Sequence, residues 1–149
     1  MTKLANEIII DARLENIWQV LVNVGELDKY DPTVRKSVQT SLIGSNLGAS
    51  RKVDMLDGKN WFEEKITVYK PNEALTFELT ACSFPIKGLK HSYSFQRNGG
   101  QTRVTQVMEY EVKWGLFGKG LDTLIIRKQS DSGIKKFLGG LKTYVEKMR

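Results

Sequence analysis

Two segments near the C-terminal half place polar side chains among apolar ones. In Ile86–Arg97 the alternation puts Leu89, His91, Tyr93 and Phe95 on one face of a strand. In Gln101–Lys113 the corresponding apolar face carries Val104, Gln106, Met108, Tyr110 and Val112. A few polar groups converging in an apolar cleft are typical of a small-molecule site. The alternative is that each polar group is satisfied by backbone or water inside an ordinary core.

Glu64 is a candidate acid or base, because it shares strand parity with Phe62 and Ile66. An inward carboxyl group loses solvation, which raises its pKa toward the range useful for proton transfer. Trp61 and Tyr69 lie on the opposite parity. The strand could therefore be turned over or bulged, which would leave Glu64 in solvent.

Arg51 shares a face with Val53 and Met55 and could bind a ligand carboxylate through both sides of its guanidinium group. It could equally pair with a glutamate of the protein. The candidates for catalysis are thus His91, Glu64, Tyr93 and Arg51, and none of them forms a recognisable acid, base and nucleophile set. Cys82 is expected to pack, and Lys128 to extend along the apolar stripe of its helix into water.

Composition excludes several classes of protein. The 149 residues include one cysteine and one histidine, so no internal disulfide and no cysteine-based metal cluster can form. We expect no metal, no cofactor and a cytoplasmic protein, because no leader and no apolar run of about 20 residues is visible. The net charge of +6 is spread along the chain, so we expect no specific nucleic-acid binding. A monomer or homodimer is expected.

The N-terminal elements must position these residues. Leu4–Asp11 is predicted to be a strand. Leu14–Val24 is predicted to be a helix, because its apolar residues recur at intervals of three and four residues, and Asp11 is its predicted cap. Glu26–Tyr30 is predicted to be a short helical turn that Pro32 ends.

From Thr33 to Val112 the apolar period is two, which indicates an antiparallel meander. The predicted strands are Val34–Leu42, Ala49–Leu56, Lys59–Tyr69, a strand around Leu75 to Leu79, Ile86–Arg97 and Gln101–Lys113. Asp57-Gly58 predicts a hairpin with a type I′ turn, which needs positive φ at both central residues. Asn98-Gly99-Gly100 predicts another hairpin.

The last predicted element is a long amphipathic helix after the glycine-rich passage 115–120. Its stripe comprises Leu121, Leu124, Ile125, Ile134, Phe137, Leu138, Leu141, Val145 and Met148. Gly139-Gly140 predicts a kink or a close contact with another element, and Gln129–Gly133 is weak enough for the helix to break there.

This order of elements resembles the START-like, or helix-grip, superfamily, in particular its bacterial polyketide cyclase/dehydrase and lipid-transport branch. The resemblance covers nearly the whole chain and is carried by Glu7–Ala12 running into Ile17–Leu21, by Glu64–Pro71, by Thr102–Thr105 and by a closing helix that begins near Gly118. It implies one α+β domain over residues 1–149, with a curved antiparallel sheet of about seven strands wrapped around a long C-terminal helix and two short helices after the first strand. It also implies a cavity between sheet and helix that takes a hydrophobic small molecule.

Function is therefore expected to be the binding or transport of a lipid, polyketide or similar molecule. One alternative is a cyclase, aromatase or dehydratase acting on a polyketide-like substrate, and another is a protein-interaction module with a solid interior. The expected ligand-binding residues are Met55, Phe62, Phe77, Leu79, His91, Tyr93, Gln106, Met108, Tyr110, Leu121, Leu124 and Ile125.

Overall fold

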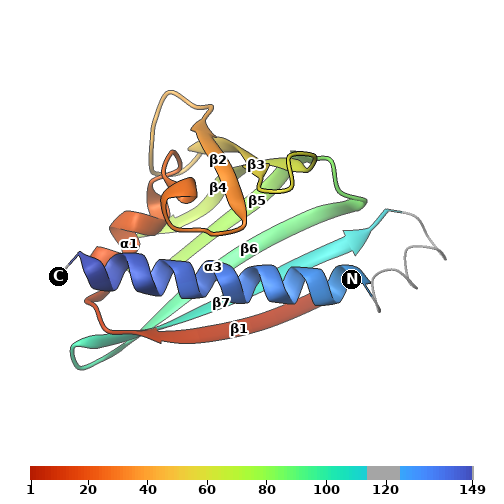
Figure 1. The fold of residues 1–149 in the computed structure, drawn as a ribbon. Helices are drawn as coiled ribbons and strands as arrows, with labels where there is room; N and C mark the ends of the chain where they lie inside the picture. Colours follow the sequence, from red (N-terminus) through yellow and green to blue (C-terminus); the bar gives the residue numbers. More distant parts are fainter. Residues whose placement is uncertain (114–124, 149) are drawn as a thin grey trace.

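A curved antiparallel sheet wraps around one long helix in the computed structural model, which describes residues 1–113 and 125–148 (Figure 1). The elements are β1 (Thr2–Ile10), α1 (Leu14–Val22), η1 (Leu27–Lys29), β2 (Val34–Gln39), β3 (Ser50–Met55), β4 (Trp61–Lys70), β5 (Ala74–Cys82), β6 (Ile86–Asn98), β7 (Gln101–Val112) and α3 (Arg127–Lys147). The sheet order is β1-β7-β6-β5-β4-β3-β2, with every neighbouring pair antiparallel. The predicted helix-grip α+β fold is confirmed.

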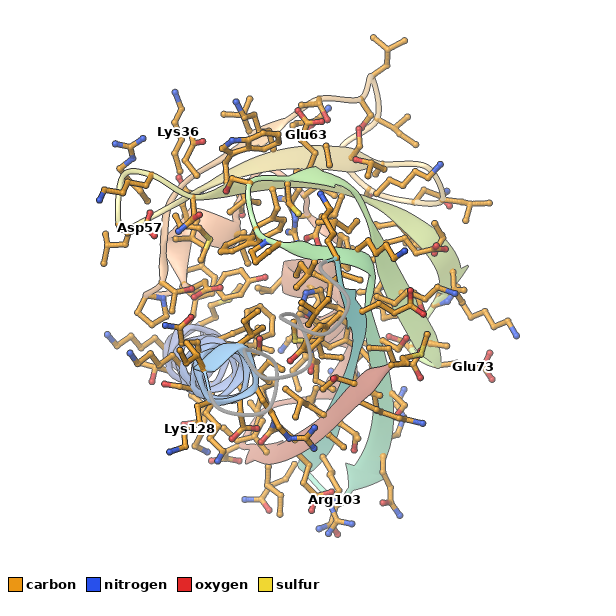
Figure 2. The ribbon with its side chains drawn as sticks, turned by 90° about the vertical axis from the view of Figure 1, so that its right-hand side faces the viewer. Lys36, Asp57, Glu63, Glu73, Arg103 and Lys128 are labelled. Atoms are coloured by element: carbon orange, nitrogen blue, oxygen red, sulfur yellow. The ribbon has the colours of Figure 1, made fainter. Side chains whose placement is uncertain are left out.

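The sheet curves because its long strands carry bulges. The pairing of β6 with β7 shifts between Lys87 and Lys90, where Gly88 has a φ of +64°. The pairing of β4 with β5 shifts twice, between Glu63 and Glu64 and between Ile66 and Val68. Each extra residue bends its strand and increases the local twist. Seen along α3, the sheet accordingly curls around the helix (Figure 2).

Helix α3 is tied to β1 by polar contacts along its length. The Asn6 amide nitrogen donates to Asp131 at 2.9 Å, Lys142 Nζ donates to the Ile9 carbonyl at 2.9 Å, and the Asp11 backbone N–H donates to Glu146 at 2.8 Å. Its apolar face, from Ile134 to Val145, is buried in the core. The helix is thus held along one edge of the sheet.

Three local predictions were wrong. Asp11 does not serve as the N-cap of α1, because the helix starts at Leu14 and its N-cap is Arg13, which makes no side-chain cap. The Asp57-Gly58 turn is not type I′: only Gly58 has positive φ, and residues 56–60 form a longer loop in which the Asp57 carboxylate accepts the backbone N–H groups of Lys59 and Asn60 at 2.8 Å. These two bonds stabilise a wider loop than a two-residue turn.

The third wrong prediction is a break at Gln129–Gly133, since α3 runs unbroken from Arg127. Asp131 lies in this stretch and pairs with Lys135 one turn later at 2.8 Å. Such a pair stabilises a helix, and the bond from Asn6 anchors the same carboxylate to β1.

The predicted close contact at Gly139-Gly140 is confirmed at the second glycine. A Cβ built on Gly140 would lie 2.0 Å from the Tyr30 carbonyl oxygen and 3.0 Å from Pro32, whereas a Cβ on Gly139 would meet nothing within 4 Å. Only glycine at position 140 lets α3 approach the chain just after η1 this closely.

These two glycines make a matched pair of substitutions. Gly139→Ala is expected to raise the free energy of unfolding by about 0.5–1 kcal/mol through helix propensity, whereas Gly140→Ala is expected to lower it by about 1–3 kcal/mol through overpacking against Tyr30. Chemical denaturation measures both. Equal effects of the two substitutions would contradict the close contact.

Candidate ligand-binding site

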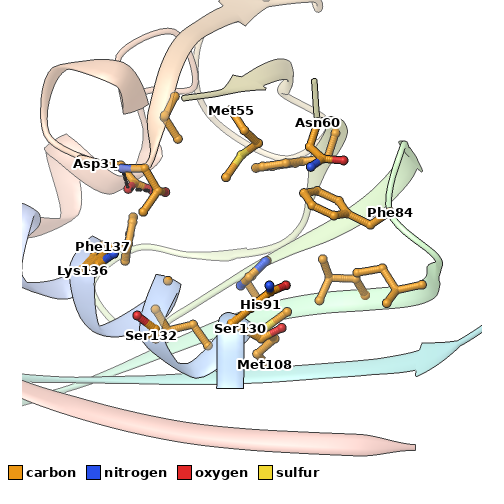
Figure 3. A pocket seen from close by; sticks show the side chains of 18 of the residues that line it. Asp31, Met55, Asn60, Phe84, His91, Met108, Ser130, Ser132, Lys136 and Phe137 are labelled. Carbon is orange, nitrogen blue, oxygen red and sulfur yellow. Dashed lines mark hydrogen bonds between the residues drawn. The ribbon is translucent and has the colours of Figure 1, made fainter. Parts of the chain in front are cut away.

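A cavity of about 780 Å³ lies between the concave face of the sheet and α3 among the described residues (Figure 3). One wall is the sheet, which contributes residues from β3, β4, β6 and β7. The opposite wall is the N-terminal half of α3, from Ile126 to Phe137. The segment Asp31–Val34 and the loop around Phe84 and Pro85 also line the cavity. Most of the lining is apolar, as a site for a hydrophobic molecule requires.

The structure brings half of the expected ligand-binding residues to this cavity. Met55, Phe62, His91, Tyr93, Gln106 and Met108 line it. Phe77 and Tyr110 are fully buried in the core, and Leu79 packs against that core without lining the cavity. Leu121 and Leu124 lie outside the described residues.

Ile125 is 48% exposed, and its neighbour Ile126 lines the cavity instead. Residues 125 and 126 form a π-helical turn at the start of α3. Ile126 lies four residues before Ser130 and eight before Ile134, so it continues the helical face that lines the cavity, whereas Ile125 does not.

Several lining residues were missed by sequence reasoning. On α3 they include Ser130, Gly133 and Lys136, whose spacing of three follows the same face as Ile134 and Phe137. A helical period extended from Ile134 and Phe137 could therefore have identified these residues from the sequence. Asp31 was also missed, and nothing in the sequence pattern places it beside the cavity, because its position depends on how η1 ends.

A buried ion pair forms the polar centre of the sheet wall. The Nη2 and Nε atoms of Arg51 lie 2.6 and 2.7 Å from Glu64 Oε2, and both side chains are less than 5% exposed. The guanidinium carbon lies 4.3 Å from the centre of the Phe77 ring, which adds a cation–π contact. Of the two alternatives for Arg51, pairing with a protein glutamate is therefore the observed one.

The orientation of β4, left open by the sequence, is also settled. Glu64 faces inward with Ile66, and Trp61 faces outward beneath Lys52, whose Nζ lies 5.2 Å from the Trp61 ring centre. The bulge between Ile66 and Val68 then reverses the parity, so that Tyr69 also turns inward and packs on Trp18 at 5.3 Å between ring centres. Glu64 is consequently a paired carboxylate and not an isolated acid.

Tyr30 and Asp31 lie next to this ion pair. The Tyr30 hydroxyl is buried, and its pKa is raised by burial although the nearby Arg51 charge acts in the opposite direction. That hydroxyl makes no hydrogen bond of good geometry in the structure. Asp31 Oδ1 accepts the Thr33 backbone N–H at 2.9 Å and the Thr33 hydroxyl at 2.7 Å. Burial raises the pKa of Asp31.

The charge of Arg51 survives its burial. Desolvation alone would lower the pKa of this guanidinium, but the adjacent Glu64 carboxylate, together with Tyr30 and Tyr93, more than offsets it, so the pKa is raised. The positive charge of the sheet wall is therefore retained and paired with one protein carboxylate through Nε and Nη2, while Nη1 has no hydrogen-bond partner.

His91 presents its imidazole to the cavity from β6 (Figure 3). Its Nδ1 lies 2.6 Å from Gln106 Nε2 on the neighbouring strand. The pKa of His91 is lowered, chiefly by burial, so the ring is neutral near neutral pH. With the Gln106 amide nitrogen donating to Nδ1, the imidazole proton resides on Nε2.

Two further polar groups complete this part of the wall. Tyr93 is directly opposite Gln106 in the β6–β7 register, and burial raises the pKa of its hydroxyl well above the usual value. Gln106 Oε1 is buried without a hydrogen-bond partner. Lys128 also lines the cavity but is exposed, in agreement with a side chain that extends into water.

Cys82 packs as expected. Its thiol contacts the carbonyl oxygens of Phe84 and Ile86 at 3.4 and 3.7 Å, and it does not line the cavity. Residues 1–113 and 125–148 contain no cluster of three or more metal-ligating side chains. No helix in these same ranges is both long enough and apolar enough to cross a membrane.

This curved sheet wrapped around a long C-terminal helix is the START-like, helix-grip fold. The chain belongs to the family described as polyketide cyclase / dehydrase and lipid transport, whose sequence model matches residues 1–146. A search of curated proteins gives no significant sequence match.

Solved structures with the same fold cover almost the whole chain. The protein TTHA0849 from Thermus thermophilus has 19% sequence identity, covers 99% of both chains and gives a TM-score of 0.83. A START superfamily protein from Mycobacterium smegmatis has 15% identity, 99% coverage of both chains and a TM-score of 0.79. XoxI from Bacillus cereus has 14% identity, covers 99% of this chain and 98% of its own, and gives a TM-score of 0.77. These likenesses establish the fold.

The Arg51–Glu64 pair predicts a non-additive mutational cycle. Glu64→Leu is expected to lower the free energy of unfolding by about 3–5 kcal/mol, because it leaves the Arg51 charge buried and unpaired. The double substitution Arg51→Met with Glu64→Leu removes both charges and is expected to recover much of that loss.

Chemical denaturation of the single and double variants measures this coupling. The exposed pair of Lys87 and Glu111, 4.0 Å apart on the outer surface, serves as the control, and its coupling is expected to be close to zero. Additive effects at Arg51 and Glu64 would show that the two charges do not depend on each other.

The lowered pKa of His91 predicts a loss of stability in mild acid. The unfolded state has a histidine pKa of about 6.5 and binds a proton before the folded state does, so stability falls as the pH drops below about 6.5 by at most about 1.4 kcal/mol per pH unit. The fall continues until the lower folded pKa is reached. His91→Leu is expected to remove this dependence, and because His91 is the only histidine, denaturation of both proteins from about pH 7 to about pH 5 isolates it. An unchanged slope in the variant would contradict a neutral buried ring.

Proposed function

We propose that this protein binds a hydrophobic small molecule, such as a lipid or polyketide, in the cavity between the sheet and α3, and carries or senses it. The observation that supports this most directly is the cavity of about 780 Å³, whose lining is mostly apolar. A volume of this size falls within the range of small-molecule sites. It is also far larger than the voids of a close-packed core.

His91 is the polar residue that we expect to meet the ligand. Its ring is neutral and faces the cavity, and Gln106 already occupies Nδ1. The remaining nitrogen, Nε2, can then donate a hydrogen bond to a ligand oxygen. Such a bond orients an otherwise apolar molecule in the cavity.

A cyclase or dehydratase is the second candidate, and one observation favours it. A neutral imidazole that presents Nε2–H to the cavity can polarise a substrate carbonyl group by hydrogen bonding and so stabilise the negative charge that develops on its oxygen. In that case Tyr93 and Gln106 would position the ring or the substrate. The paired Arg51 and Glu64 would be less suited to proton transfer, because each charge stabilises the other.

Native mass spectrometry of the freshly purified protein, followed by extraction and identification of any bound compound, tests the binding proposal. We expect a bound apolar molecule, or uptake of one from a panel of lipids and polyketide-like compounds. A protein that is isolated empty and takes up none of these would favour the interaction module instead.

His91→Leu is expected to keep the fold and to weaken binding of the identified ligand by about 1–3 kcal/mol, because one buried hydrogen bond is lost. Met108→Leu also changes the cavity wall but removes no polar group, and it is expected to leave the affinity nearly unchanged. Titration calorimetry compares the two. If the protein is an enzyme, turnover by His91→Leu should fall by about a hundredfold or more, and unchanged affinity and turnover would remove His91 from the site.

A further inference from the structure

The charges around the cavity restrict the chemical class of its ligand, an inference that rests on the proposed binding function. The sheet and the segment that follows η1 place one guanidinium group and two carboxyl groups at the cavity wall. They belong to Arg51, Glu64 and Asp31. Glu64 accepts hydrogen bonds from both Nε and Nη2 of Arg51 through a single oxygen. The edge of the guanidinium formed by Nε and Nη2 is therefore already occupied, and only Nη1 is left without a partner.

No other cation on this wall can replace Arg51. His91 lines the cavity and burial lowers its pKa, so it brings no positive charge near neutral pH. Asp31 adds a second acidic group within electrostatic reach of Arg51. The wall as a whole has no excess positive charge, and an anionic group placed against it would be buried without a counter-ion, which is costly.

The lysines of α3 do not add positive charge to the wall that the sheet forms. Lys128 and Lys136 line the cavity from the opposite wall, but both are exposed, so their ammonium groups stay in water. A ligand that placed a carboxylate near them would turn its apolar end toward Arg51, His91 and Gln106. The buried Nη1 of Arg51 and Oε1 of Gln106 would then stay without partners, and the imidazole of His91 would gain none.

The same wall does offer hydrogen bonds to an uncharged group. The imidazole of His91 is open to the cavity, with Nδ1 fixed by Gln106. On the same wall, one nitrogen of Arg51 and the oxygen of Gln106 are buried without partners. A wall that combines donors and acceptors with no net positive charge fits a carbonyl or hydroxyl oxygen.

We propose that the cavity takes an uncharged ligand that carries a ketone, ester or hydroxyl oxygen, and that it discriminates against the carboxylate with the same carbon skeleton. The oxygen lies against the wall formed by Arg51, His91 and Gln106. The apolar skeleton fills the space between Phe62, Met108 and α3.

Two fluorescent probes of matched skeleton test this selectivity. Pyrenebutanol is uncharged, and pyrenebutanoate is ionised at about pH 8. Fluorescence titration is expected to show that the wild-type protein binds the alcohol at least about tenfold more tightly. The ring signals of His91, the only imidazole in the chain, should shift on binding and so locate the probe in the cavity.

Glu64→Gln provides the decisive variant, because it frees the charge of Arg51 without changing the size of the side chain. Its preference for the alcohol is expected to narrow by at least about tenfold or to reverse. Glu63→Gln is the matched control, since the neighbouring carboxyl group lies on the outside of the sheet (Figure 2), and it should keep the wild-type preference. Circular dichroism verifies that each variant is folded, and Asp31→Asn, which also removes one acidic group from the wall, replaces Glu64→Gln if the latter does not fold.

The outcomes separate the two proposals. Equal or tighter wild-type binding of pyrenebutanoate, with the His91 signals shifted, would overturn the selectivity and leave the binding function intact. An unchanged preference in a folded Glu64→Gln protein would overturn the role of the charge balance. If neither probe binds and His91 does not respond, the binding function itself fails, and the selectivity fails with it.

Discussion

The ion pair between Arg51 and Glu64 is the interaction on which the concave face of the sheet depends. Two opposite charges without access to bulk water are tolerable only together, because each would cost several kcal/mol of desolvation alone. Their contact fixes β3 against β4, and the Phe77 ring beneath the guanidinium extends the constraint to β5. The pair also determines what surrounds it, since the Tyr30 hydroxyl and the Asp31 carboxyl both lie within the field of the Arg51 charge.

The cavity exists because α3 is held at its C-terminal half and along one edge of the sheet. Gly140 brings the helix into contact with the Tyr30 carbonyl, and the aromatic rings of Phe137 and Tyr144 pack on Tyr30 from both sides of that contact, each 5.7 Å away between ring centres. The N-terminal half of the helix is linked to β1 through Asn6 and Asp131. Between these attachments the helix spans the hollow of the sheet without filling it.

The sequence was sufficient for the order of the elements and for the inward faces of β6 and β7. His91 and Tyr93 were placed by simple alternation, which works there because the bulge of β6 lies before them, between Lys87 and Lys90. Alternation was not enough for β4, because the bulge after Ile66 puts both Glu64 and Tyr69 on the inside. A bulge of this kind leaves no clear mark in residue types.

The specific pairing of Arg51 with Glu64 could have been predicted from the sequence, but it was not. A two-residue turn at Asp57-Gly58 would place Leu56 opposite Lys59, and the same register continued along the hairpin places Arg51 opposite Glu64. The structure has this register although its loop is wider than the predicted turn. The position of Asp31 could not be derived in this way, because it depends on contacts of the neighbouring Tyr30 and Pro32 with α3, which is distant in sequence.

The crossing at Gly140 also makes α3 a lever. Thirteen residues separate Gly140 from the start of the helix at Arg127, which corresponds to an arm of about 20 Å at 1.5 Å per residue. A rotation of about 5° around that crossing displaces the far end by about 2 Å, roughly the radius of a methyl group, while the buried C-terminal half hardly moves. The part-buried bond between Asn6 and Asp131, four residues from the start of the helix, resists this rotation together with the packing of Ile134 and Phe137. A polar contact at the edge of the sheet, outside the cavity lining, therefore helps to set the width of the hollow.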